Sequence, residues 1–393
     1  MNNKIKGIIF LILLSFSAQS QISYPTVEKG LSFKSEDKKV NMKFSFRIQS
    51  LSSFETNESG NDQEMKAMIR RMRLKSNGYI YSPKFQYKLE LALSNRDLGI
   101  TKDADRVSDG SKIVLDAVVK YAFSKNQQIW FGQTKLPGNR ERVISSMALQ
   151  FVDRSNVNSK FNIDRDFGVQ YRLNQSVGKM PVKLAAAITT GEGRNITATN
   201  EKNGLAYTGR LEFYPLGNFS NKGDYFSADL VREAKPRLAI GVTSCINKNT
   251  NRSGGQLGSF VSVINASGND SALFNDITTL FVDAVFKFKG FSFMGEYANK
   301  QLSDDILGFT SGSGYVGQMG YLFENNYEVS TRYTSVDLAK GLANTLNTKE
   351  YTLGLSKYIV GHKLKVQSDV SYIQTENTSE PNYRIRFQVE IGI

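Results

Sequence analysis

Basic side chains at every second position of one short segment are the residues in this sequence best placed to do chemistry. Arg71, Arg73 and Lys75 alternate with Met72 and Leu74, so an extended chain points all three cations to one side. Guanidinium groups bind phosphate through a planar fork of donors, whereas lysine acts as a point charge. Such a row predicts attraction and weak binding of anions at several sites, with no bond made or broken.

In other segments the same alternation predicts further cations on the face that carries Arg71, Arg73 and Lys75. A charge that faces lipid costs about 2–4 kcal/mol at the membrane midplane, so the charged face is expected to be the wet one. Lys135 is placed with this set. The cations assigned to a water-filled lumen are Arg71, Arg73, Lys75, Lys88, Lys120, Lys135, Arg172, Arg210 and Arg332.

Carboxylates share the predicted wet face and leave a second interpretation open. Each cation is then a solvated residue beside a carboxylate neighbour, and the 37 acidic residues offset much of the charge of the 50 basic ones. The carboxylates in the inward phase are Glu90, Asp116, Glu212, Asp283, Glu296 and Glu328.

Signals for an enzyme are weak. His362 is the one histidine in the sequence and lies in a predicted turn, where a surface role is the more common one. No cluster of His and Cys has the spacing of metal ligands, so neither a metal nor another cofactor is expected. The glycines of 191–194 are not followed by a helical pattern and do not predict a phosphate-binding loop. We therefore predict that the chain is not an enzyme.

Period-two alternation recurs along nearly the whole chain and predicts strands. From Asn382 to Ile393 it is uninterrupted, with Ile385 and Phe387 on the oily face and Arg384 and Arg386 on the other. About sixteen such segments, joined alternately by short and long connections, predict an all-β fold, a transmembrane antiparallel β-barrel. Polar stretches at 191–204, 247–276, 299–313 and 335–349 predict its longer loops.

One segment, Gly138 to Phe161, breaks the alternation. Val143, Met147 and Phe151 are four residues apart and favour a short helix inside a long connection. In a wide barrel such a loop can fold inward and narrow the lumen, although a surface loop with a helical turn fits the same pattern. The basic residues assigned to this constriction loop are Arg140, Arg142, Arg154 and Arg165.

The first residues have the pattern of a secretory signal. Lys4 and Lys6 precede an apolar core at 7–16, and small residues follow at Ala18 and Ser20. We expect a signal peptide at 1–20, an N-terminal periplasmic segment at 21–42 and an outer-membrane barrel at 43–393. Removal of two lysines lowers the formal charge from +13 to +11, and export argues against nucleic acid as a partner of this basic chain.

Several motifs, taken in order, resemble the phosphate-selective porins O and P. Each motif is weak alone, but the ordered set spans most of the chain. The matching stretches are Gly30 to Phe33, Arg47 to Gln49, Arg70 to Leu74, Phe131 to Pro137, Phe151 to Ser155, Arg165 to Gln170 and Gly209 to Gly217.

This resemblance implies a sixteen-stranded outer-membrane barrel, a homotrimer, that passes anions by diffusion, but it does not carry phosphate selectivity with it. Together with the row of cations, it predicts a diffusion channel for small hydrophilic solutes that prefers anions such as phosphate. Expected partners are outer-membrane lipid and lipopolysaccharide, and small anionic solutes. Two other interpretations stay open: a plugged, non-conducting barrel with a structural or binding role, and a soluble exported β-protein.

Overall fold

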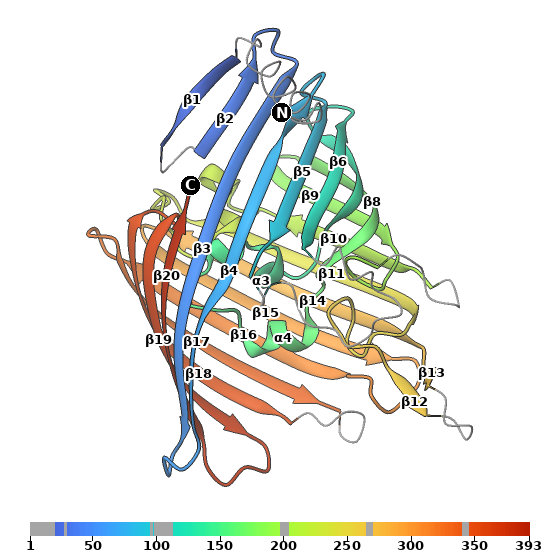
Figure 1. The fold of residues 1–393 in the computed structure, drawn as a ribbon, viewed down its shortest axis with the longest axis vertical. Helices are drawn as coiled ribbons and strands as arrows, with labels where there is room; N and C mark the ends of the chain where they lie inside the picture. Colours follow the sequence, from blue (N-terminus) through green and yellow to red (C-terminus); the bar gives the residue numbers. More distant parts are fainter. Residues whose placement is uncertain are drawn as a thin grey trace, which may run out of the picture.

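Sixteen antiparallel strands close into one barrel in the computed structural model (Figure 1). The structure describes residues 20–26, 30–94, 97, 113–196, 204–264, 270–339 and 346–393. The last strand pairs with the first, from Asn382 opposite Asn57 to Gly392 opposite Arg47, and so closes the ring. The predicted all-β barrel is confirmed, whereas the predicted signal peptide lies, except for Ser20, outside the described residues.

All sixteen barrel strands match predicted period-two segments. They are β3 (Val40–Asn57), β4 (Gln63–Ile80), β5 (Phe85–Ala92), β6 (Val114–Ala122), β7 (Gln127–Lys135), β8 (Arg165–Val177), β9 (Met180–Thr189), β10 (Ala206–Phe213), β11 (Arg237–Thr250), β14 (Asn275–Phe288), β15 (Phe291–Leu302), β16 (Gly312–Leu322), β17 (Tyr327–Leu338), β18 (Thr348–Val360), β19 (Leu364–Thr375) and β20 (Asn382–Gly392). A separate hairpin, β12 (Ser262–Ile264) with β13 (Asp270–Ala272), lies in the connection after β11.

The final strand shows which face of the barrel is oily. Ile385 and Phe387 are 48% and 49% exposed on the outer face. Arg386, between them, is buried on the inner face and donates two hydrogen bonds to Asp369, at 2.6 and 2.8 Å. Residues paired across antiparallel strands share a face, so this phase passes from strand to strand. The predicted apolar outer face and charged inner face of β20 are confirmed.

The two ends of the barrel differ in their connections. Six connections of two to four residues lie at one end, the turn end: 81–84, 123–126, 178–179, 289–290, 323–326 and 361–363. The opposite end, the loop end, carries the long connections 93–113, 136–164, 190–205 and 251–274. One long connection, 214–236, departs from this division because it starts at the turn end.

A row of tyrosines follows the outer face near the loop end. Tyr315, Tyr333, Tyr351, Tyr372 and Tyr383 come from five successive strands, and each ring centroid lies 4.8–6.2 Å from the next. Tyrosine rings concentrate at membrane interfaces because one end is apolar and the other is polar. This row has the form of an interfacial girdle.

Two short strands precede the barrel and extend its sheet. β2 (Gly30–Ser35) pairs with β3 from Leu31 opposite Phe44 to Lys34 opposite Asn41, and β1 (Ser20–Thr26) pairs with β2. Figure 1 shows this pair beyond the end of β20, beside the C-terminus. Part of the segment predicted as 21–42 therefore adds strands to the sheet; its periplasmic location stays a prediction.

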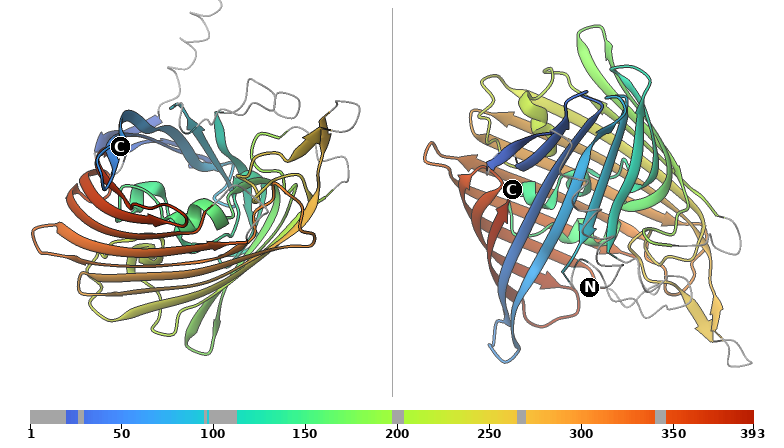
Figure 2. Two further views of the ribbon diagram at one scale, coloured as in Figure 1. Left: turned by 90° about the horizontal axis from the view of Figure 1, so that it is seen from below. Right: turned by 45° about the horizontal axis from the view of Figure 1, so that its top comes forward.

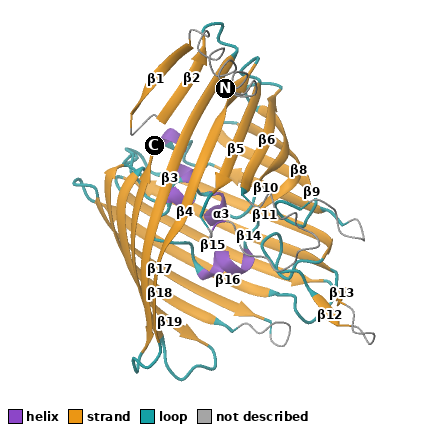
Figure 3. Ribbon diagram, viewed as in Figure 1, coloured by secondary structure: helices purple, strands orange, loops and turns teal. Residues whose placement is uncertain are grey.

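The long connection 136–164, here called the constriction loop, folds into the barrel (Figures 2 and 3). It holds three short helical turns instead of the one predicted helix: α3 (Arg140–Val143), η1 (Ser146–Ala148) and α4 (Asn156–Phe161). Ser155 caps α4 by accepting a hydrogen bond from the Asn158 amide at 3.1 Å. Within the described ranges, no helix is both long enough and apolar enough to cross a membrane.

An apolar core fills part of the lumen. Leu136, Val157 and Phe161 of the constriction loop pack against inward-facing Phe281 and Val316 of the wall. These five side chains are at most 3% exposed, so water is excluded from this side of the barrel. The inner surface is therefore divided into a packed part and an open part.

Candidate functional site

A β-bulge in β4 places two consecutive arginines in the lumen. Gln49 of β3 pairs with Arg71, and the next residue, Ser50, pairs with Ile69, so Arg70 is the extra residue. The bulge shifts the side-chain phase by one position. Strict alternation therefore predicted the inward direction of Arg71 but not that of Arg70. The structure places both side chains against the open part of the lumen.

Asp153 ties the constriction loop to this bulge. Arg70 Nη2 donates to Asp153 Oδ2 at 2.6 Å, and Arg71 Nη2 donates to Oδ1 at 2.9 Å. Burial alone would raise the pKa of Asp153, but the charges of Arg71 and Arg70 outweigh burial and hold the pKa well below its usual value. The carboxylate stays ionised and neutralises one of the two arginines.

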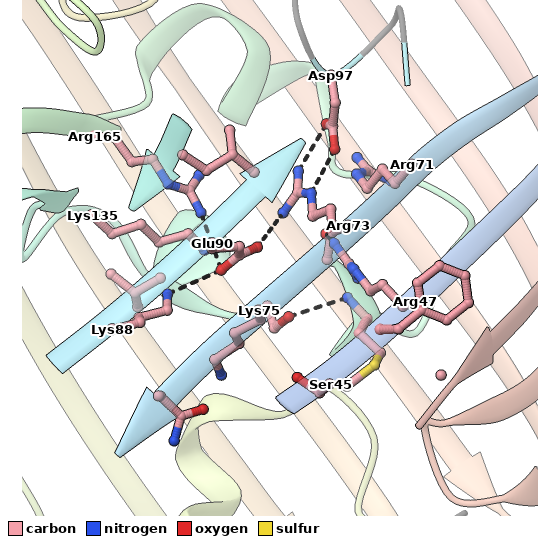
Figure 4. Close-up of a pocket in the computed structure, with 18 of the residues that line it drawn as sticks. Ser45, Arg47, Arg71, Arg73, Lys75, Lys88, Glu90, Asp97, Lys135 and Arg165 are labelled. Atoms are coloured by element: carbon pink, nitrogen blue, oxygen red, sulfur yellow. Dashed lines mark hydrogen bonds and ion pairs between the residues drawn. The ribbon is translucent and has the colours of Figure 1, made fainter. Parts of the chain in front are cut away.

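Glu90 of β5 gathers three cations on the same wall (Figure 4). Its Oε1 lies 3.1 Å from Arg73 Nη1, and its Oε2 lies 3.1 Å from Lys88 Nζ and 3.9 Å from Arg165 Nη2. Arg73 also donates to both carboxylate oxygens of Asp97, at 2.5 and 2.8 Å. Asp116 binds Lys88 at 2.6 Å and Arg165 at 3.1 Å, and Asp164 lies 3.7 Å from Arg165, so these three cations share four carboxylates.

Lys135 and Arg154 bind main-chain oxygens instead of acids, whereas Arg142 pairs with Asp164. Lys135 Nζ donates to the carbonyl of Arg142 at 2.7 Å, and Arg154 donates to the carbonyls of Glu141 and Ile144 at 2.9 and 2.7 Å. Carbonyl groups hold these cations in place and leave their charge uncompensated. These contacts therefore fix the loop without reducing the positive field.

A cavity of about 670 Å³ lies between this wall and the constriction loop. Its described lining holds three acidic residues, Glu90, Asp97 and Asp164. It holds thirteen basic residues: Lys43, Arg47, Arg70, Arg71, Arg73, Lys75, Lys88, Lys135, Arg142, Arg154, Arg165, Arg194 and Lys363. Eight of these thirteen are residues that the sequence analysis assigned to the lumen or the constriction loop. Arg165 is among the eight, and it begins β8.

A second cavity of about 330 Å³ lies toward the turn end and shares Lys75 and Lys88 with the first. Lys120 lines this second cavity, and its Nζ lies 3.8 Å from the ring centroid of Trp130. Within the described residues, Lys43, Lys75 and Lys120 have no carboxylate within 4.0 Å. Positive charge therefore continues from the first cavity toward the turn end.

Arg140 and Arg210 lie away from both cavities, behind the constriction loop. Arg140 Nε donates to Asp283 at 2.9 Å, and its Nη2 lies 2.5 Å from Glu212. Arg210 donates to the same two carboxylates at 2.7 and 2.8 Å. Arg210 points inward, as its phase predicted, but the constriction loop, which carries Arg140, covers it. Both arginines join this loop to the wall.

Arg332 and Arg172 also lie outside the cavity linings. Arg332 Nη1 donates to the Asp153 carbonyl at 2.9 Å, and its guanidinium lies 4.6 Å from the Phe151 ring centroid. Arg172 donates to Gln170 at 2.9 Å. Alternation gives the face of a strand. The contact of Arg332 with Asp153 depends on the distant constriction loop, whereas Arg172 bonds a residue of its own strand.

Five cavity cations were not assigned by the sequence analysis: Lys43, Arg47, Arg70, Arg194 and Lys363. Lys43 and Arg47 share the inward phase of β3 and were within reach of the same alternation. Arg70 depends on the bulge, and the other two lie in connections where no phase applies. In the described part of the chain, no group of three or more His, Cys, Asp or Glu is placed to hold a metal ion.

Comparison with known proteins identifies the kind of barrel. A family model described as phosphate-selective porin O and P matches residues 40–390. The chain belongs to this family. As a member of this porin family it is an outer-membrane channel protein, and the family points to a channel rather than an enzyme. The turn end is the periplasmic end because porin turns are periplasmic. A search of curated proteins found no match.

Solved structures share the porin fold at low identity. The anion-selective porin from Comamonas acidovorans has a TM-score of 0.57 at 10% identity, covering 90% of this chain and 99% of that one. The outer membrane channel DcaP of Acinetobacter baumannii has a TM-score of 0.54 at 12% identity, with 92% and 99% covered. OmpT of Vibrio cholerae, in its trimer form, has a TM-score of 0.51 at 12% identity, with 89% and 99% covered.

The ion pairs of Asp153 predict that this attachment of the constriction loop does not change in mild acid. The pKa of Asp153 is lower in the folded protein than in the unfolded chain. Its ion pairs therefore stabilise the loop fully at every pH above the ordinary carboxyl pKa of about 4. That stabilisation is lost as the pH falls through the folded pKa. We expect single-channel conductance in chloride to stay constant from pH 8 to pH 5. A current step near pH 6 would contradict this prediction.

Proposed function

We propose that this porin is a diffusion channel that favours small anions, phosphate among them, and that ions pass along the wall formed by β3–β6. Support comes from the charge of the main cavity, whose described lining carries thirteen basic residues and three acidic ones. Low-dielectric walls focus such a field and raise the local concentration of anions.

Passage requires that each binding site be weak. Arg71 and Arg73 are already bonded to Asp153, Asp97 and Glu90, so an anion that approaches them competes with carboxylates. That competition keeps binding shallow enough for the anion to leave. Farther toward the turn end, lysines without a carboxylate partner offer point charges, which attract anions without fixing their orientation.

Phosphate is favoured over chloride in this proposal because of the arginines. A guanidinium group donates two parallel hydrogen bonds to a tetrahedral oxyanion, whereas chloride has no matching pair of acceptors. Arginine and lysine side chains from β3, β4 and β5 face one cavity in Figure 4, so a moving oxyanion meets several donors in succession.

Three further features belong to the proposal. The mature chain begins after cleavage at Ser20, the barrel assembles as a homotrimer, and the outer surface contacts outer-membrane lipid and lipopolysaccharide. The trimer agrees with the assembly named for the similar OmpT of Vibrio cholerae, and the tyrosine row on the outer face suits a lipid interface.

A planar lipid bilayer tests the proposed function. Under a gradient of potassium chloride, the reversal potential should have the sign of chloride selectivity. Selectivity should weaken toward 1 M salt, where the screening length falls to about 3 Å. Added phosphate should reduce the chloride current, because it occupies the arginine sites.

Two results would contradict the proposal. A potassium-selective reversal potential would show that the carboxylates govern the field. The absence of any conductance from correctly folded protein would favour the plugged barrel with a structural or binding role, which the partly filled lumen also suits.

A further inference from the structure

The connection 214–236 is unusual for its end of the barrel. It joins β10 to β11, which pair directly from Phe213 opposite Ile240, so a short turn would suffice. Instead it folds inward and contains a 3-10 turn, η2 (Ser220–Tyr225). Phe219 and Asp224 are 6% and 2% exposed. We call this connection the inner segment.

The inner segment meets the constriction loop, which enters from the opposite end. The Ser227 amide donates to the Ala148 carbonyl at 2.9 Å, and Arg140 Nη1 donates to the Asp224 carbonyl at 3.3 Å. Ala148 and Phe219 also belong to one buried apolar cluster. Apolar burial and hydrogen bonds therefore join the two elements inside the barrel.

Buried polar contacts fasten the inner segment to the wall. Lys287, which is 1% exposed, donates to the carbonyls of Gly223 and Ala228 at 2.8 and 2.7 Å. Asp229 accepts a hydrogen bond from the Gly290 amide at 2.9 Å. Burying an ammonium group without such partners would cost roughly several kcal/mol of folding free energy. Because these contacts avoid that cost, they resist movement of the segment away from the wall.

An aromatic contact completes the attachment at the turn end. The ring of His362 stacks on Phe226 with centroids 5.3 Å apart and planes 20° apart, and Tyr358 meets its edge. Burial lowers the pKa of His362 well below its usual value, and Lys365 and Lys287 lower it further. The imidazole is therefore neutral at physiological pH and behaves as an aromatic packing surface.

Carboxylates lie on the part of the wall that these two elements cover. Glu212, Asp283 and Glu328 face inward and are at most 3% exposed. Tyr225 of the inner segment donates to Glu212 at 3.2 Å. None of these acids lines either cavity, and no residue of 214–236 does so.

We propose that the inner segment is a fixed second lumen-filling element and a determinant of ion selectivity. It closes the turn end of the barrel over a wall whose carboxylates are paired with cations, such as Glu212 and Asp283 with Arg210, so ions meet only the basic wall of β3–β6. This inference rests on the proposed function and deepens it, because the field of the pore depends on which wall is covered.

The first test removes the element. Residues 216–236 are replaced by a turn of about four residues, as the direct pairing of β10 with β11 allows. Conductance in potassium chloride should rise by at least about twofold, since a second water path opens in a wide barrel. The reversal potential should shift toward potassium, because the second path runs beside paired charges, such as Glu212 and Asp283 with Arg210, and lacks the excess of cations of the first path.

The second test leaves the fold intact. Ser227→Cys is made with Cys245→Ser, so that the variant has one thiol, and a charged thiol reagent is added during current recording. The buried thiol should stay unmodified and the current unchanged. An accessible control, Asn77→Cys in the same background, should react, because Asn77 lines both cavities.

Either of two outcomes would overturn the inference. A folded 216–236 variant with parental conductance and reversal potential would show that the inner segment does not confine the path. Modification of Ser227→Cys with a fall in current would show that ions pass beside it. Failure of the proposed function is recognised separately, as an unaltered chain that does not conduct or prefers cations.

Discussion

Replacing Arg71 and Arg73 by Gln should abolish most of the anion preference. At about 10 Å in water, one charge contributes about 0.4 kcal/mol to an ion's energy. Removing both charges therefore raises the energy of a passing anion by about 0.8 kcal/mol and lowers that of a cation by the same amount. The permeability ratio of anion to cation then changes by about tenfold. The reversal potential in a potassium chloride gradient measures this ratio.

The effect should exceed that of charge loss alone, because the double variant leaves Asp97 and Asp153 with fewer cationic partners. A matched control removes two charges from the outer face, as Lys349→Gln with Lys357→Gln on β18. That control should keep the parental reversal potential. Equal shifts in both double variants would mean that net charge, and not the cavity wall, determines selectivity.

Replacing Arg140 by Met should give the largest loss of stability. Arg140 is fully buried and bonds Glu212, Asp283 and the main chain of Asp224. Removing one partner of a buried ion pair costs about 3–5 kcal/mol because the remaining charge stays buried. The variant should lose its heat-modifiable folded band on a gel at a lower temperature than the parent.

Two further variants sharpen this measurement. Adding Glu212→Gln to Arg140→Met should restore part of the stability, since Arg210 alone then faces one buried carboxylate instead of two. Lys39→Met breaks an ion pair that is more than half exposed, and it should leave the unfolding temperature close to that of the parent. A parental unfolding temperature for Arg140→Met would contradict the proposed attachment of the loop.

Alternation was sufficient to predict the barrel. A strand between lipid and water must place an oily side chain at every second position, so the face of Ile385 and that of Arg386 follow from sequence alone. The same rule failed at Arg70, because a bulge adds one residue and shifts the phase. Nothing in the local sequence of β4 marks that shift except the paired arginines.

The contents of the lumen were harder to predict, because they depend on contacts between distant segments. Arg210 was correctly directed inward, but the constriction loop covers it, and Arg140 of that loop binds the wall instead of lining a cavity. The inner segment at 214–236 was not predicted at all. Apolar side chains in the inward phase, such as Phe281 and Val285, were the available signal, since an apolar residue facing the lumen requires something packed against it.

Thiol modification of Lys75→Cys, in a Cys245→Ser background, tests most directly whether ions pass along the wall of β3–β6. A negatively charged reagent added during current recording should block the pore, and it should react faster than a positively charged one. Thr334→Cys, on the covered far wall, should give no block. An unchanged current through modified Lys75→Cys, or equal block at Thr334→Cys, would contradict the proposed path.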